Sequence, residues 1–256
     1  MHRRDEMERT GDIEKLARDI VNAKKIVALS GAGMSVESGI ASFRGAGGLW
    51  ERYDPEEYGH ISTLRNAPEK AWLMLRDMHL EINKAQPNKG HYALFELEKL
   101  GKLSSIITQN VDGLHHIAGN TNIIEFHGNL LTVVCMDCGH SVPSEEISLD
   151  EIPPFCAKCG GPVKPDAVFF GEAIPHEALT RSHHEATTCD LMLVIGTSAF
   201  VYPAASMPEI AGSAGARIVE INTAPTPLTG RISDYIVQGP SGDVLDKTVK
   251  LVKDMI

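Results

Sequence analysis

Long apolar runs and an excess of positive charge are both absent from this sequence. No apolar stretch in its 256 residues approaches the ~20 residues that a helix needs to cross a bilayer. The first ten residues are too charged for a secretory signal, and we expect a solvated, partly frayed tail there. Lys and Arg number 24 against 34 Asp and Glu, so the formal net charge of -10 disfavours binding to nucleic-acid backbones or anionic lipids. We therefore predict a cytoplasmic protein without a membrane partner, which meets nucleic acid only indirectly if at all.

Cysteine is scarce as well, and its spacing indicates a metal site. Four of the five cysteines form two Cys-x-x-Cys pairs, Cys135 with Cys138 and Cys156 with Cys159. Two such pairs separated by seventeen residues are typical of one structural zinc ion held by four thiolates. A site closed by four thiolates leaves no open position for substrate, so the zinc would hold a small module together. Two redox disulfides, or His140 as a substitute ligand, are the alternatives.

Residues next to the cysteine pairs, and the fifth cysteine, have structural interpretations. Gly139 and Gly160 follow the second cysteine of each pair and can adopt the positive φ that turns a backbone amide toward a sulfur. Cys189 stands at the start of the apolar run 190–195, so we interpret it as a buried packing side chain.

Apolar patterns predict alternating strands and helices. A buried strand begins at Ile26, and further strand-like runs lie at 105–108, 123–126, 167–170, 191–195 and 218–221. Helical patterns cover 13–21, 68–83 and 87–100, and Pro203 begins another helix that ends near Gly215. Almost continuously apolar strands separated by helices indicate a parallel sheet covered on both faces. The sequence therefore predicts a doubly wound α/β core.

Two segments interrupt this alternation. Residues 45–84 show helices without a clear strand, and residues 130–165 carry the cysteines among prolines and glycines. Because the core pattern resumes after each, we predict a large domain of residues 11–44, 85–129 and 166–256. Residues 45–84, as a helical module, and 130–165, as a zinc module, would form a smaller, discontinuous domain.

The run from Ile26 to Ser35 predicts a strand that ends in a glycine turn, which in α/β proteins presents backbone amides to a pyrophosphate. Its glycines at 31, 33 and 39 do not follow the usual G-x-G-x-x-G spacing, so this signal alone is weak. Polar clusters also follow other strands, at 109–112, 127–129, 196–198 and 220–222. Each alone fits an ordinary turn, but together they indicate one ligand beyond the carboxyl ends of the strands.

His127 is the best general-base candidate, because it follows the apolar run 123–126 and an imidazole there could accept a proton from a bound hydroxyl. From its pattern alone, a structural role is equally open. His115 and His116, on a short predicted helix, and His183 and His184, on a charged one, are interpreted as packing or surface residues.

Taken together, these motifs resemble those of the sirtuins, NAD-dependent protein lysine deacylases, over nearly the whole chain. The resemblance is carried by residues 31–35, 38–40, 43–45, 108–112, 114–115, 118–119, 125–128, the paired cysteines, Pro165, 168–172, 196–198, Val201, 203–205 and 221–222. It implies a Rossmann-like NAD-binding large domain, a small zinc domain, and a cleft between them that receives NAD and an acyl-lysine peptide.

The resemblance also implies roles for individual residues. His127 and Asn110 would be catalytic, and His127 would help to deprotonate a ribose hydroxyl after the acyl oxygen has displaced nicotinamide. The products would be nicotinamide, lysine and O-acyl-ADP-ribose. The NAD contacts would be Gly31, Ala32, Gly33, Ser35, Phe43, Arg44, Gln109, Asn110, Asp112, Gly196, Thr197, Ser198, Asn222, Asp243 and Val244.

For the substrate, the resemblance implies that the acyl-lysine peptide pairs as an added strand between two segments. These are Val168, Phe169, Phe170, Gly171 and Glu172 on one side and the loop around Val201 on the other. Family members that prefer succinyl or malonyl lysine carry a Tyr and an Arg three residues apart on the helix here at 68–83. Leu75 and Met78 stand at those places, so we predict removal of a neutral acyl group such as acetyl.

Two other functions remain possible from the sequence. A mono-ADP-ribosyltransferase would cleave NAD in the same way and pass the ribosyl group to a protein side chain. A zinc-ribbon module that binds nucleic acid is disfavoured by the acidic charge and by the lack of a basic, aromatic stripe in residues 130–165.

Overall fold

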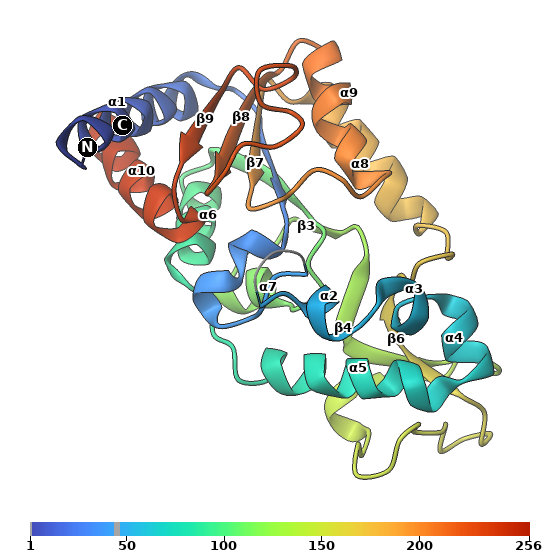
Figure 1. The fold of residues 1–256 in the computed structure, drawn as a ribbon. Helices are drawn as coiled ribbons and strands as arrows, with labels where there is room; N and C mark the ends of the chain where they lie inside the picture. The colour runs from blue at the N-terminus through green and yellow to red at the C-terminus, as the bar shows by residue number, and fades with distance from the viewer. Residues whose placement is uncertain (1, 44–46) are drawn as a thin grey trace.

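The structure, a computed structural model, describes residues 2–43 and 47–256, with side chains from residue 11 onward within these ranges. Six parallel strands form its main sheet (Figure 1). They are β1 (Ile26–Ser30), β2 (Leu103–Thr108), β3 (Ile123–Glu125), β7 (Leu191–Ile195), β8 (Arg217–Asn222) and β9 (Tyr235–Gln238). Their order is β3-β2-β1-β7-β8-β9, so the sheet grows in one direction from β1 and then in the other. In such sheets ligands bind beyond the carboxyl ends of the strands at this reversal.

Helices cover both faces of the main sheet (Figure 1). On one face pack α1 (His2–Asn22), α6 (Lys89–Lys99) and α10 (Ser241–Met255), whose apolar side chains share a cluster with Ala28 of β1. On the other face pack α8 (His176–Thr188) and α9 (Met207–Ser213), in a cluster that includes the neighbouring Val27. Successive side chains of β1 therefore face opposite layers, both of them buried. The predicted doubly wound α/β fold is confirmed.

A second, three-stranded sheet carries the cysteine-rich part of the chain. Its order is β5-β4-β6, and β4 (Gly128–Cys135) pairs antiparallel with β5 (Ser141–Pro143) and β6 (Val163–Ala167). The segment before it in the chain forms α2 (Leu49–Arg52), α3 (Pro55–Tyr58), α4 (Ile61–Asn66) and α5 (Pro68–Ile82). Trp72 of α5 and Val163 of β6 belong to one apolar cluster, which holds the helices against this sheet. The predicted smaller unit of helices and a metal module is present, while the boundaries of the two domains stay a prediction.

Local sequence explains how the helices next to the site begin. Asn88 caps α6, because its side chain accepts a hydrogen bond from the Gly90 amide at 2.9 Å while the His91 ring accepts one from the Asn88 amide at 3.3 Å. Pro68 occupies the first turn of α5, where its missing N–H leaves no helical bond unmade. α7 (Leu114–Ala118) follows β2 and carries His115 and His116, as predicted.

Three expectations about secondary structure are corrected, and three strands were missed. The opening residues continue α1 from His2 and do not form a separate tail. The apolar run 167–170 is not a strand of the parallel sheet: β6 ends at Ala167 and pairs antiparallel with β4. The helix after Pro203 begins as a 3-10 turn, Ala204–Ser206, before α9. β4, β5 and β9 were not predicted: β5 and β9 have only three and four residues, and the apolar residues of β4 are interrupted by Thr132 and only partly buried. Among the described residues, no helix combines the length and apolar character needed to span a bilayer.

Candidate active site

One large cavity lies beyond the carboxyl ends of β1, β2, β3, β7 and β8 and reaches α5. Its volume is about 890 Å³. Gly31 and Gly33 of the glycine turn line it, and so does His127 from the loop between β3 and β4. The structure therefore brings the turn and the imidazole to one cavity, as the prediction of a shared ligand requires.

The glycine turn packs directly on the loop that follows β7. The Gly33 amide donates to the carbonyl oxygen of Gly196 at 2.7 Å, and a Cβ on Gly33 would lie 2.7 Å from the same oxygen. Gly196 has a φ of 57°, a conformation that side chains disfavour. Glycine is thus required at both positions for the two loops to approach this closely.

Backbone amides at these strand ends are available to a ligand. In the described part of the chain, the N–H groups of Ala32, Thr197 and Ser198 donate to no protein atom, and all three residues line the cavity. Unpaired amides at the ends of parallel strands suit the oxygens of a pyrophosphate. The donor set therefore fits a dinucleotide such as NAD.

Polar side chains link the ends of three strands across the cavity floor. The side-chain amide of Gln109, which follows β2, donates to the hydroxyl of Thr197, which follows β7, at 3.0 Å. The Asn222 side chain at the end of β8 donates to the Thr197 carbonyl oxygen at 2.8 Å. This chain of hydrogen bonds fixes the relative positions of polar groups that come from distant parts of the sequence.

His127 is held in the tautomer that a general base needs. Its Nδ1 lies 3.2 Å from the Gln109 carbonyl oxygen, and since that oxygen can only accept, Nδ1 carries the proton. Nε2 then has a free lone pair. Burial lowers the pKa of His127 below 6.5, while the bond to Gln109 acts in the opposite direction. The imidazole is therefore neutral at pH 7 and able to accept a proton at Nε2.

Asn110, Ser35 and Asp112 form a second polar chain beside the main cavity. Asn110 donates to the Ser35 hydroxyl at 3.1 Å, and Ser35 donates to the Asp112 carboxylate at 2.7 Å. Burial raises the pKa of Asp112, and the Ser35 hydrogen bond partly offsets that rise. Ser35 and Asp112 line a small cavity of about 30 Å³ that shares Ala32, Phe43 and Asn110 with the large one. This side pocket could hold a small polar group next to the main ligand.

The segment 168–172 and the loop around Val201 both line the large cavity, as predicted. Val168 donates its amide to the His127 carbonyl oxygen at 2.9 Å, which ties this segment to the base. The amides of Gly171 and Val201 have no partner among the described residues. An extended peptide could therefore pair with both segments. Glu172 also holds its own segment, through an ion pair with Lys164 at 3.1 Å.

Most of the predicted NAD contacts lie where the sequence analysis expects them. The large cavity is lined by Gly31, Ala32, Gly33, Phe43, Gln109, Asn110, Gly196, Thr197, Ser198 and Asn222. Asp243 and Val244, in the first turn of α10, do not line it: the Asp243 carboxylate pairs with Lys89 at 3.3 Å, and Val244 is buried in the core cluster. Pro240 and Ser241, just before them, line the cavity instead. Arg44 lies outside the described residues.

Other lining residues were not predicted. They include Glu37, Trp50, Met74, Phe200, Tyr202 and residues 223–227. The apolar ones look like ordinary packing residues in the sequence. Residues 223–227 follow the predicted polar cluster 220–222 directly, so extending that cluster into the next turn could have found them.

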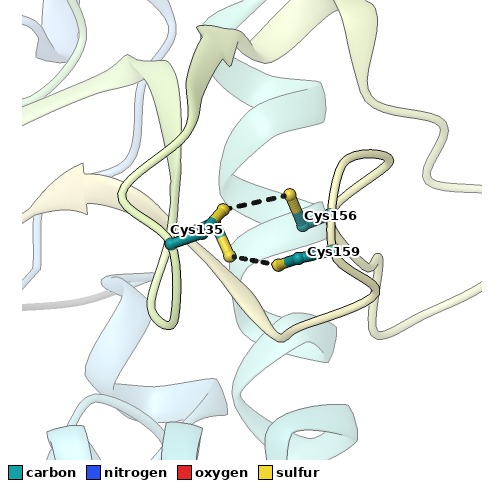
Figure 2. A group of neighbouring side chains, drawn as sticks. Cys135, Cys156 and Cys159 are labelled. Carbon is teal, nitrogen blue, oxygen red and sulfur yellow. Dashed lines mark hydrogen bonds between the residues drawn. The ribbon is translucent and has the colours of Figure 1, made fainter.

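The four paired cysteines come together at the end of the small sheet, away from the large cavity. Figure 2 shows the side chains of Cys135, Cys156 and Cys159 pointing toward one another. The four sulfurs lie within 4.8 Å of each other, with Cys135 and Cys159 at 3.5 Å and Cys138 and Cys156 at 3.8 Å. Thiolates at a Zn–S distance of about 2.3 Å around one tetrahedral zinc would be about 3.8 Å apart.

Zinc therefore fits this cluster, with no position left for substrate. Gly139 and Gly160 have φ values of 68° and 74°, as predicted, and the Gly161 amide points at the Cys159 sulfur at 3.4 Å. The fifth cysteine, Cys189, is buried, and burial raises its pKa to about 11, which agrees with a packing role.

Comparisons with known proteins agree with this site. The family model described as the Sir2 family matches residues 31–203. NAD-dependent protein deacylase 2 of Pyrobaculum aerophilum is 45% identical over 234 residues, which are 91% of this chain and 93% of that protein. The crystal structure of a Sir2 homologue complexed with NAD superposes with a TM-score of 0.88 at 46% identity and covers 94% of both chains. A Sir2 complex with a p53 peptide and NAD+ superposes with a TM-score of 0.85 at 30% identity, covering 92% of this chain and 97% of the other. The chain therefore belongs to the Sir2 family.

Proposed function

We propose that this protein removes acetyl or other neutral acyl groups from protein lysines in a reaction that consumes NAD and releases nicotinamide, the free lysine and O-acyl-ADP-ribose. One observation carries the proposal: the amide-lined glycine turn and the neutral His127 imidazole line the same cavity. The relatives support it, since the Pyrobaculum protein is named a deacylase and a related structure holds NAD with a peptide.

The residues divide into three groups along the cavity. The unpaired amides of Ala32, Thr197 and Ser198 bind phosphate oxygens, and Gln109 and Asn222 orient the riboses. Residues 168–172 and Val201 pair with the peptide backbone and direct an acyl-lysine side chain inward. NAD, when bound, supplies the ribosyl carbon that accepts the acyl oxygen.

The protein's own catalytic task is proton transfer. Nε2 of His127 accepts a proton from a ribose hydroxyl while Nδ1 stays bonded to the Gln109 carbonyl, so the ring need not turn. Asn110 lies between the base loop and the side pocket, where it holds Ser35 and through it Asp112. Since the nucleophile is the substrate's own acyl oxygen, no serine or cysteine nucleophile is needed.

The acyl end of the cavity is apolar. Met74, Leu75 and Met78 of α5 line it, and no Lys or Arg of the described residues is among the lining residues of the cavity. A carboxylate from a succinyl group would lose its hydration there without gaining a partner, which costs several kcal/mol. The protein therefore prefers neutral acyl groups.

The decisive experiment measures nicotinamide release from NAD with and without an acetyl-lysine peptide. We expect release that depends on the peptide and a matching amount of O-acetyl-ADP-ribose. His127→Ala should lower kcat/KM by roughly 100- to 10,000-fold, the usual contribution of a general base.

A matched control is His184→Ala, since His184 lies on exposed α8 away from the cavity. Nicotinamide release without peptide, together with label from NAD retained on protein, would contradict deacylation and favour the ADP-ribosyltransferase alternative.

A further inference from the structure

Glu220 is a buried carboxylate on β8, the strand next to the edge strand β9 of the main sheet. It lies on β8 between Val194 of β7 and Ile236 of β9, and only 1% of its surface is exposed. On the same face of β8, two residues earlier, stands the apolar Ile218 of the core. Burial of a charge at a position where an apolar side chain would pack calls for specific partners.

The partners of Glu220 are three hydroxyl groups from one loop. Its Oε1 accepts hydrogen bonds from Thr229 and Ser233, each at 2.6 Å, and its Oε2 accepts one from Thr226. No ion pair to Glu220 occurs within residues 11–43 and 47–256, so these hydroxyls alone satisfy it. A hydrogen bond to a charged acceptor is stronger than one between neutral groups.

The three hydroxyls fix the shape of the loop that follows β8. The Thr226 amide donates to the Thr229 hydroxyl at 2.9 Å, and the Leu228 amide donates to the Thr226 hydroxyl at 3.1 Å. Leu228 is buried in the core beside α9. Glu220 therefore sits at the centre of a closed turn whose hydroxyls serve both the carboxylate and the loop backbone.

The outer side of this turn is the wall of the large cavity. Residues 222–227 line it, together with Thr197 from the loop that follows β7. Thr223 and Ala224 are exposed, and Pro225 and Pro227 have no N–H to contribute hydrogen bonds of their own. The loop thus depends on its hydrogen bonds to Glu220 to keep the residues that line the cavity in place.

We infer that Glu220 is a positioning residue for NAD, which holds the loop 223–229 as the wall against which the dinucleotide binds. The inference rests on the proposed function, because it assigns NAD to the cavity. Glu220 touches no ligand: it acts through Thr226 and Thr229. Loss of its anchor lowers the fraction of molecules with a binding-competent wall and so weakens apparent affinity by that fraction.

Two variants and two measurements test this. Glu220→Gln replaces one accepting oxygen by an N–H₂ group, and Thr229→Val removes one hydroxyl at nearly constant volume; neither residue lines the cavity. Calorimetric titration with ADP-ribose should show a Kd roughly three- to tenfold higher for both, since Glu220→Gln removes the charge that strengthens all three hydrogen bonds and Thr229→Val removes one of these bonds. In turnover with an acetyl-lysine peptide, the KM for NAD should rise while kcat and the KM for peptide stay near the wild-type values.

Controls separate positioning from general stability. Glu209→Gln removes a carboxylate on α9 that makes no hydrogen bond with the described residues, and it should leave the ADP-ribose Kd unchanged. Thr229→Ser keeps the hydroxyl and should restore wild-type affinity. If Glu220→Gln does not fold, Thr229→Val carries the test alone.

An ADP-ribose Kd within twofold of wild type in Thr229→Val and in any folded Glu220→Gln overturns the inference and leaves the proposed function intact. Failure of the wild-type protein to bind ADP-ribose overturns both.

Discussion

At the scale of single residues, we expect His127, the proposed general base, to set the pH range of the reaction. Burial lowers its pKa below 6.5, and the base works only when it is unprotonated. We therefore expect the acidic limb of kcat/KM for an acetyl-lysine peptide to be centred below pH 6.5. The full pH profile, measured with saturating NAD, checks this. An acidic limb centred above pH 6.5 would contradict the environment that the structure gives to this imidazole.

Two other histidines, His91 and His115, link stability to pH. Both are buried with ring centroids 4.9 Å apart, and His91 Nε2 and His115 Nδ1 have no hydrogen-bond partner among the described residues. Burial lowers the pKa of His91 to about 4, and burial with the neighbouring His91 lowers that of His115. Below about pH 6.5, these two imidazoles bind protons in the unfolded chain but stay neutral in the folded chain. The free energy of unfolding therefore falls as the pH falls.

For His91 alone this loss amounts to about 3 kcal/mol by pH 4. Urea unfolding at pH 7 and pH 5 should show lower stability at pH 5. His91→Gln keeps an acceptor for the Asn88 amide but cannot be protonated, so its stability should depend less on pH. Equal pH dependence in the variant and the wild type would rule out His91 as the source.

We expect acyl specificity to depend on single residues as well. Leu75 and Met78 line the apolar end of the cavity, one helical turn apart on α5. The double variant Leu75→Tyr/Met78→Arg introduces a phenol and a cation there, and we expect it to gain desuccinylation while deacetylation falls at least roughly tenfold, since a buried polar pair without its ligand partner is unfavourable.

The control places a tyrosine on the same helix away from the cavity. Leu73 is 40% exposed and does not line it, so Leu73→Tyr should leave the ratio of the two activities unchanged. Product analysis with matched acetyl and succinyl peptides gives this ratio. Strong desuccinylation by the wild-type protein would overturn the predicted preference.

At the scale of secondary-structure elements, prediction succeeded where burial is complete. β1 and β7 are buried at every position, so their continuous apolar runs identify them without knowledge of their neighbours. β4 has alternating burial and lies across from β6, and nothing local indicates that pairing. The run 167–170 is apolar because it lines the cavity and meets Gly59 and Ile61, a tertiary contact that no local pattern shows.

The same distinction holds for site residues. The polar clusters were found because their strands are unmistakable and parallel strands end at one edge of the sheet. Whether Pro240 and Ser241 or the neighbouring Asp243 and Val244 line the cavity depends on how α10 approaches the segment after the glycine turn, where the Gly242 amide donates to Glu37 at 2.6 Å. That approach is a matter of packing angle and is not encoded within a few residues.

The small sheet depends on zinc as an element of structure. Its strands are short, and the four thiolates join the hairpin of β4 and β5 to the loop before β6. We expect one zinc ion per chain by atomic absorption. Removal by a chelator with a thiol-reactive agent should lower both Tm and activity, because the metal-binding free energy is folding free energy.

Cys156→Ser should lose the ion in the same way, whereas Cys189→Ala, which alters the buried cysteine outside the cluster, should keep it. Full activity in a zinc-free protein would contradict a structural role for the metal.

At the scale of the whole molecule, the cavity joins parts of the chain that fold around different cores. Its wall includes strand ends of the main sheet and α5 with residues 167–172, which belong to the cluster around the small sheet. A ligand that touches both therefore stabilises their arrangement. The predicted domain boundaries and the cytoplasmic location stay predictions at this scale.

Thermal unfolding with ADP-ribose tests this coupling. At 100 times its Kd the ligand adds about 2.7 kcal/mol, which for a chain of this size raises Tm by roughly 5 to 10 °C. AMP carries only one ribose and one phosphate, so it lacks the contacts of the second ribose and second phosphate and should stabilise less at equal concentration. If AMP and ADP-ribose raised Tm equally, the second ribose would make no contact of consequence. The chain of hydrogen bonds from Asn222 through Thr197 to Gln109 would then serve the fold alone.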